Sequence, residues 1–446
     1  MNNIHNLLGS HSSKKIFLVI IALMTIILID TFLIKFYDLV DKNFIPILEK
    51  KIIFTAIVFG FISLEFIMIN YVKKLIAKEK SNSKMDVKIT SLLASLSYYA
   101  LMILFSLLIF ELYYFDYYDT LLIMIIISIS FGVASIFIGK TVLLFISWFR
   151  FKHNFIFLLY FTSMSMILFN LVVTSIIVNA SINDRPTQIR EYAGGSINIS
   201  AGKYDYLLSL FKISAVLSFG SFWLTTSLLM YSSKDKIIGK VQYWIILIIP
   251  LVYFVISYFA QYILSGIILP YLNSDPISVS LVLTSVFILS KPIGGIVFGV
   301  SFWRISKLVG FQKTLQGYVT IAGYGFLLLF SGNQAASLVL VPYPPFGITT
   351  ISILIIASYL IYIGIYKSAT MISSNAKIRK YIYEISSDSK LLNLSGRTEM
   401  EKEIESTVDK VIEIADTPTE ESDFEMDEKE LKNYVEKVIR ELRKNN

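Results

Sequence analysis

The sequence contains no cysteine and only three histidines, His5, His11 and His153. Without thiols the chain cannot form disulfides, thiolate nucleophiles, iron–sulfur clusters or thiolate zinc sites. All three histidines lie outside the long apolar runs, which excludes a haem or copper centre held by two histidines within a bilayer. No complete nucleotide-binding, metalloprotease or nucleophile-elbow motif is present either. We therefore expect a non-enzymatic protein with no catalytic residue, no metal and no cofactor.

Charge is also scarce, since only 16% of the residues are charged, against about a quarter in soluble proteins. The formal net charge of +7 is unevenly distributed. Residues 381–446 carry 18 acidic and 10 basic residues, so the basic excess lies entirely before them and flanks apolar segments. This asymmetry is typical of a membrane protein with an acidic soluble tail. We expect no nucleic-acid partner.

Long apolar runs fill the chain from residue 16 to residue 366. A run of about 20 apolar residues can cross the hydrocarbon core of a bilayer, and a spanning segment must be helical to satisfy its backbone hydrogen bonds. The sequence predicts an all-α, multi-pass bundle in the cell membrane, with the lipid bilayer as its main partner. The ten predicted spans are 16–36, 52–72, 89–111, 120–148, 154–180, 207–231, 242–269, 277–302, 314–331 and 346–366.

Lysine and arginine are concentrated in every second gap between these runs. Within residues 1–380, one set of gaps together with the segments next to the first and last runs holds 20 of them, and the opposite set holds seven. Because cytoplasmic loops carry the basic excess, this bias predicts that both termini are cytoplasmic. Residues 1–15 would be a cytoplasmic segment, residues 16–366 the transmembrane domain, and residues 367–446 a cytoplasmic tail.

Five charged residues fall within the predicted spans: Asp30, Glu65, Lys140, Lys212 and Lys291. A charge at the bilayer centre costs at least about 2.5–3.5 kcal/mol on insertion scales, so each is a functional candidate. Asp30 and Lys212 lie near the outer boundary and can reach water. The other three lie deeper. A structural ion pair of Glu65 with Lys140 or Lys291, or an ion-coupling site, would explain them, and the sequence leaves both open.

The predicted span 277–302 is the most irregular. Its centre contains Pro292 and three glycines, Gly294, Gly295 and Gly299. Proline removes a backbone donor, and a broken helix beside a charge is how many transporters build a site at the bilayer midplane. The spacing of Gly295 and Gly299 also permits close helix packing. The pattern favours a kinked packing helix over a binding site.

The tail contains two amphipathic segments, 397–415 and 429–445. Gly396 is interpreted as a helix stop between the membrane-proximal part and the first segment. In the second, apolar residues form one stripe. Such short helices cannot make a large core, so we expect residues 397–445 to dock a cytoplasmic protein partner. The residues expected to dock are Leu431, Val435, Val438 and Leu442.

The motif Tyr343-Pro344-Pro345-Phe346-Gly347 leads into Ala357-Ser358-Tyr359-Leu360 and then into a basic stretch around Lys377-Ile378-Arg379-Lys380. Over about residues 340–410, this pattern resembles a group of uncharacterised polytopic membrane proteins from ammonia-oxidising archaea. The group has no assigned activity, so the resemblance implies a multi-pass architecture and no site residues.

Three functions remain open. The leading hypothesis is a receptor or scaffold in which the outer loop 181–206 meets a ligand and the tail relays to a cytoplasmic partner. The second is a secondary transporter or channel that uses the intramembrane charges, and the third is a membrane-embedded lipid enzyme. The sequence decides neither the ligand nor the oligomeric state.

Overall fold

Every element in the described part of the chain is a helix, which confirms the predicted all-α membrane bundle. The computed structural model describes residues 11–39, 46–78, 85–183, 205–231, 243–245, 247–255, 276–336, 344–384 and 390–415. The helices are α2 (His11–Leu39), α3 (Ile47–Ala77), α4 (Met85–Tyr114), α5 (Thr120–Lys152), α6 (Phe155–Asn183), α7 (Asp205–Tyr231), α10 (Pro276–Leu308), α11 (Lys313–Ala336), α12 (Ile348–Ser374), α13 (Ala376–Glu384) and α14 (Lys390–Ala415).

Eight of these helices are long and apolar enough to cross a membrane, namely α2 to α7, α11 and α12. Helix α10 covers the predicted span 277–302 with 33 residues. The predicted span 242–269 is represented by helical residues 243–245 and 247–255, and its remainder lies outside the described residues. The chain therefore has the architecture of a multi-pass membrane protein.

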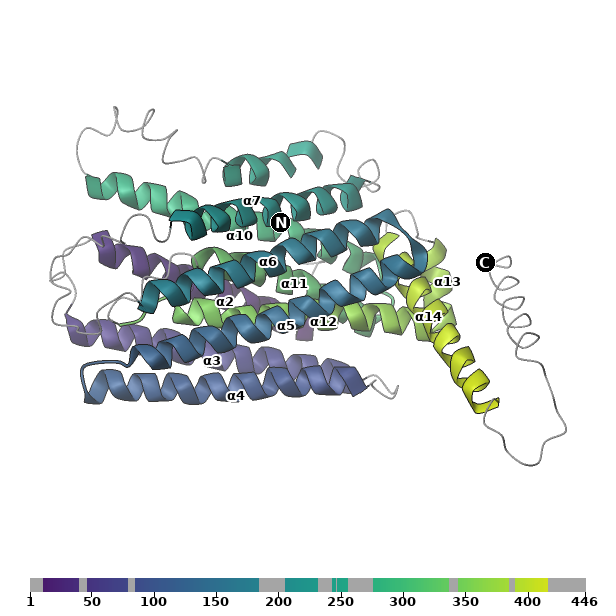
Figure 1. Ribbon diagram of the computed structural model, residues 1–446, viewed down its shortest axis with the longest axis horizontal. Helices are drawn as coiled ribbons and strands as arrows, with labels where there is room; N and C mark the ends of the chain where they lie inside the picture. Colours follow the sequence, from purple (N-terminus) through teal and green to yellow (C-terminus); the bar gives the residue numbers. More distant parts are fainter. Residues whose placement is uncertain are drawn as a thin grey trace.

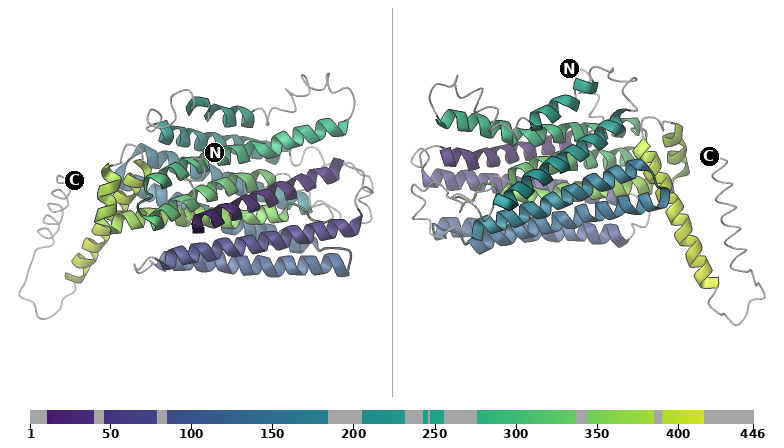
Figure 2. Two further views of the ribbon diagram at one scale, coloured as in Figure 1. Left: turned by 180° about the vertical axis from the view of Figure 1, so that it is seen from behind. Right: turned by 45° about the horizontal axis from the view of Figure 1, so that its top comes forward.

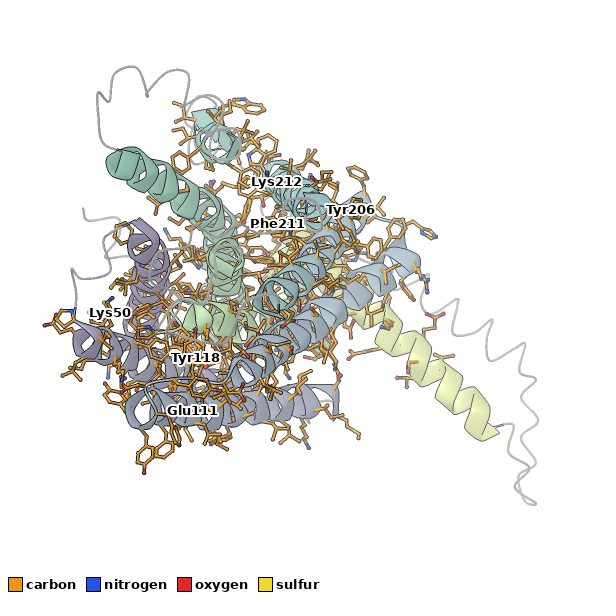
Figure 3. All side chains as sticks on the ribbon, turned by 60° about the vertical axis from the view of Figure 1, so that its left-hand side comes forward. Lys50, Glu111, Tyr118, Tyr206, Phe211 and Lys212 are labelled. Carbon is orange, nitrogen blue, oxygen red and sulfur yellow. The ribbon has the colours of Figure 1, made fainter. Side chains whose placement is uncertain are left out.

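The long membrane helices lie side by side, and the tail helices α13 and α14 lie at one end of the bundle (Figure 1). The same arrangement appears from behind, where α14 projects from that end at a steep angle (Figure 2). We call this end the tail end and the opposite end the cap end. Contacts between α3 and the α4–α5 connection define the cap end, where Lys51 pairs with Asp116. Figure 3 views the molecule toward that end and shows Lys50, Glu111 and Tyr118 from these neighbouring elements.

Helix α12 is the axis of the bundle. Its residues from Ile348 to Ala369 are all buried, because α11, α5, α4, α3 and α2 surround its membrane part and α14 covers its end. The approach to α11 is close enough to require glycine. A Cβ atom on Gly325 would lie 2.7 Å from the carbonyl oxygen of Ala357, and one on Gly364 would lie 2.7 Å from that of Tyr318. Small residues at these positions let the two backbones touch.

Helix α10 continues through Pro292 without interruption, so the chain is not broken at this residue. The glycines that follow are contact points. A Cβ on Gly299 would lie 3.0 Å from the carbonyl oxygen of Gly323 on α11, and one on Gly295 would lie 3.1 Å from that of Leu327. Gly294 faces the ring of Phe219 on α7. The structure thus places all three glycines in helix packing, between α7 and α11.

Candidate functional site

Two charged side chains and a tyrosine, each from a different helix, meet at the tail end of the bundle. Asp86 lies in the first turn of α4, where a carboxylate is favoured by the helix dipole. The Lys140 ammonium of α5 donates to Asp86 Oδ1, and the Tyr362 hydroxyl of α12 donates to Asp86 Oδ2. The Lys140 Nζ also lies 5.6 Å from the centroid of the Tyr362 ring, a cation–π distance. Lys140 is thus paired with Asp86 and not with Glu65.

The length of α5 indicates that this triad lies near a membrane boundary, whereas the sequence predicted a deeper position for Lys140. Helix α5 begins at Thr120, beside the cap-end residues Asp116 and Asp119. Lys140 follows Thr120 by 20 residues, which is about 30 Å of helix and equals the thickness of the hydrocarbon core. Sequence reasoning missed the partner because Asp86 precedes the predicted span 89–111 and looked like part of a loop.

A cavity of about 770 Å³ opens beside the triad, between the bundle and α14. Its volume lies within the range of small-molecule sites, which is about 300–1,000 Å³. The wall combines charges of both signs with hydroxyl groups and two leucines. Its lining residues are Asp86, Lys140, Leu143, Leu144, Ser147, Tyr362, Tyr366, Glu399, Lys402, Glu403, Ser406 and Thr407.

Helix α14 forms one wall of the cavity because polar contacts fix it to the bundle. The buried Trp148 Nε1 donates to Glu399 Oε2 at 3.0 Å, and Lys152 forms an ion pair with Glu401 at 2.9 Å. Two further hydrogen bonds join this helix to α12 and α5. Ser373 donates to Glu403 at 3.1 Å, and Lys402 donates to Ser147 at 2.9 Å.

The interpretation of Gly396 as a helix stop was wrong. This residue lies inside α14, which runs unbroken from Lys390 to Ala415. A Cβ atom on Gly396 would overlap the side chain of Ile372 on α12. Glycine is needed here for close approach of two helices and not for a turn. The sequence shows only the residue type, and the two uses of glycine look alike without the neighbouring helix.

Asp30 lies at the cap end and is fully buried, although the sequence predicted that it would reach water. Its carboxylate accepts from the Gly347 N–H at 2.9 Å and from the Thr350 N–H at 3.1 Å. It also accepts from the hydroxyls of Thr350, at 2.9 Å, and Thr349. These groups form the first turn of α12, so Asp30 of α2 satisfies donors that the start of a helix leaves unpaired. Gly347 has a φ of 93°, which favours glycine at this junction.

Glu65 lies on the buried stripe of α3, between Phe61 and Met68, with 1% of its surface exposed. Among the residues that the structure describes, neither of its carboxyl oxygens has a hydrogen-bond partner. A buried polar group without a partner costs free energy and is a candidate for function. Of the two pairs predicted for Glu65, the pair with Lys140 does not form, and the pair with Lys291 involves a side chain outside the described residues.

The remaining predicted residues are dispersed or undescribed. Lys212 lies on α7 near the cap end (Figure 3). Lys291 belongs to α10, but its side chain lies outside the described residues, as do the loop 184–204 and the tail residues 416–446, which include Leu431, Val435, Val438 and Leu442. No group of three or more histidine, aspartate or glutamate side chains that could hold a metal ion occurs in the described residues.

Comparison of the chain with protein-family models, with curated proteins and with solved structures gives no match.

Proposed function

We propose that this chain is a membrane relay protein, in which α12 couples the cap end of the bundle to the tail helix α14. One observation carries the proposal: Asp30 holds the first turn of the buried axial helix, and α14 packs on its other end. The Lys/Arg bias of the sequence supports a cytoplasmic position for the tail end. A partner that binds the tail would then sense the position of α12.

A helix that is enclosed along its length can transmit a displacement, because packed interiors are stiff and interfaces adopt discrete arrangements. The tail contacts supply the readout. Glu399 and Glu403 attach α14 to Trp148 of α5 and to Ser373 of α12. A shift of α12 relative to α5 would therefore change the position of α14 on the bundle. A ligand or partner at the cap end would provide the input.

The absence of cysteine permits a clean test by spin labelling. Phe155→Cys on α6 and Glu405→Cys on α14 are both exposed positions, and paired labels on them report the distance from α14 to the bundle in nanodiscs. In a relay, adding Asp30→Asn weakens the hold on α12 at the cap end and shifts or broadens that distance distribution.

The matched control is Asp116→Asn, which removes a cap-end carboxylate that contacts α3 and not α12. It should leave the distribution unchanged. If Asp30→Asn also leaves it unchanged while the thermal stability of the protein falls, the two ends are not coupled and the relay proposal is wrong.

A secondary transporter or channel is the second candidate, and one observation favours it: the buried carboxyl of Glu65, whose oxygens accept no hydrogen bond from the described residues. Such a group can exchange a proton or coordinate a cation during transport. Glu65→Gln keeps the shape of the side chain and removes its charge. In proteoliposomes that carry a pH or sodium gradient, the variant should lose gradient-driven flux. Equal flux in the wild type and the variant would remove this candidate.

A further inference from the structure

The cavity at the tail end lies at the depth of lipid headgroups. The Asp86–Lys140–Tyr362 triad marks the boundary of the hydrocarbon core, as the 20-residue distance from Thr120 indicates. Beyond it, α5 continues for 12 residues to Lys152 and forms the wall of the cavity together with α14. A ligand in this cavity would therefore lie in the interfacial layer.

The hydrogen-bonding groups of the wall leave donors available. Both oxygens of Asp86 are occupied, by Lys140 and by Tyr362. An ammonium group has three N–H donors. Lys140 directs one of them to Asp86, and Lys402 directs one to the neutral hydroxyl of Ser147. Lys402 is the better anchor for an anionic group, because Lys140 forms an ion pair with Asp86 and Lys402 forms none among the described residues.

The charge of the wall disfavours a simple anion. The wall holds two lysines and three carboxylates, so an added anion would increase the negative excess. A simple cation would leave the donors of Lys402 unused. A zwitterion satisfies both conditions, with its anionic group on Lys402 and its cationic group toward the carboxylates. Tyr362 and Tyr366 stack with their centroids 5.7 Å apart and form an aromatic surface suited to an ammonium group.

Apolar surface at the mouth of the cavity leads toward lipid. Leu143, which lines the cavity, is 67% exposed, and Met85 and Ile89, which flank Asp86 on α4, are 77% and 48% exposed. Leu143 and Met85 lie on the tail-end side of the triad, in the interfacial layer, and Ile89 lies about one turn deeper, so this surface leads from the cavity to the acyl chains. A headgroup can therefore occupy the cavity while its chains stay in the bilayer.

We propose that this cavity binds the headgroup of a zwitterionic phospholipid, with its phosphate on Lys402 and its ammonium facing Tyr366 and Glu399. The lipid bridges the bundle and α14. This site is independent of the proposed relay, because it would exist equally in a transporter.

Native mass spectrometry of the full chain tests the proposal. The protein is exchanged into detergent with equal amounts of phosphatidylethanolamine and phosphatidylglycerol, and the retained lipid is identified. We expect one phosphatidylethanolamine per chain. Lys402→Gln should lower its retention roughly tenfold, since a charge-assisted hydrogen bond is lost. Lys390→Gln, an exposed lysine at the start of the same helix and outside the cavity lining, should have no effect.

A second variant tests the site through its shape. Leu143→Trp fills the mouth of the cavity and should also release the lipid, whereas Ile136→Trp, on the exposed face of α5 two turns away, should not. Equal retention of phosphatidylglycerol, or equal loss with both lysine variants, would mean annular lipid only and overturn the proposal. Displacement of the lipid by soluble phosphoethanolamine at the same concentration would assign the site to a soluble ligand, which also overturns it.

Discussion

At the scale of single residues, the two buried carboxyl groups, Asp30 and Glu65, differ in how many hydrogen bonds they accept. Asp30 accepts four hydrogen bonds at the start of α12, whereas the oxygens of Glu65 accept none from the described residues. Removing a buried acceptor that has all its hydrogen bonds leaves the donors unpaired and lowers stability. Removing a buried acceptor that has none removes the free-energy penalty of burying it and raises stability. Opposite effects on stability follow for the two residues.

We expect Asp30→Ala to destabilise the bundle by about 2–4 kcal/mol, because a helix cap and two buried backbone donors lose their acceptor. Thermal unfolding in detergent measures the change. Asp116→Ala is the control. The Asp116 side chain is 80% exposed, so the loss of its ion pair with Lys51 should cost less than about 1 kcal/mol. Equal effects of the two substitutions would show that Asp30 does not hold α12.

Glu65→Met should raise the free energy of unfolding by about 1–3 kcal/mol, since an apolar side chain of similar size replaces an unsatisfied buried carboxyl. The same unfolding measurement applies. Glu49→Met, on the exposed part of α3, should change stability by less than about 0.5 kcal/mol. A loss of stability in Glu65→Met would reveal a partner for the carboxyl, and the transporter candidate would lose its basis.

At the scale of elements, the close contact of α11 with α12 depends on glycine. We expect Gly364→Ala to cost about 1–3 kcal/mol, because the added methyl group would meet the Tyr318 carbonyl at 2.7 Å and force the helices apart. Gly139→Ala on α5 is the matched control, since its Cβ meets nothing within 4 Å. That substitution should stabilise the helix by about 0.5–1 kcal/mol. If both substitutions stabilise, the two backbones are not in contact.

The elements themselves could be predicted from sequence, but their neighbours could not. Apolar runs of sufficient length must form helices in a bilayer, so α3, α4 and α5 were expected. Partners depend on which helices pack together. Asp86 contacts Lys140 across 54 residues and Tyr362 across 276, and no one-dimensional pattern encodes those pairs.

The burial of Asp30 and the role of Gly396 could not be predicted from the sequence for the same reason. Asp30 was assigned to water because it lies near a span boundary, yet it is fully buried against Gly347 and the first turn of α12. Gly396 was interpreted as a stop because glycine commonly ends helices. Each error came from a neighbour that only the folded bundle supplies.

At the scale of the whole molecule, the tail end and the cap end should lie on opposite sides of the membrane. Asp116→Cys at the cap end and Glu405→Cys at the tail end place single thiols in a cysteine-free chain. We expect a membrane-impermeant maleimide added to intact cells to label only the first. The second should react only after permeabilisation. Labelling of both in intact cells would contradict the threading of the bundle.

The enclosure of α12 also bears on how the molecule is made. Protein surrounds this helix, and all the membrane helices that enclose it precede it in the chain. During synthesis these helices are inserted before α12, and lipid fills the groove that α12 will later occupy. The interior of the bundle is therefore complete only after α12 has been inserted. Helix α14 can pack against the bundle only after that step. A ribosome that stalls before residue 348 leaves an assembly without its centre, which is a natural substrate for membrane quality control.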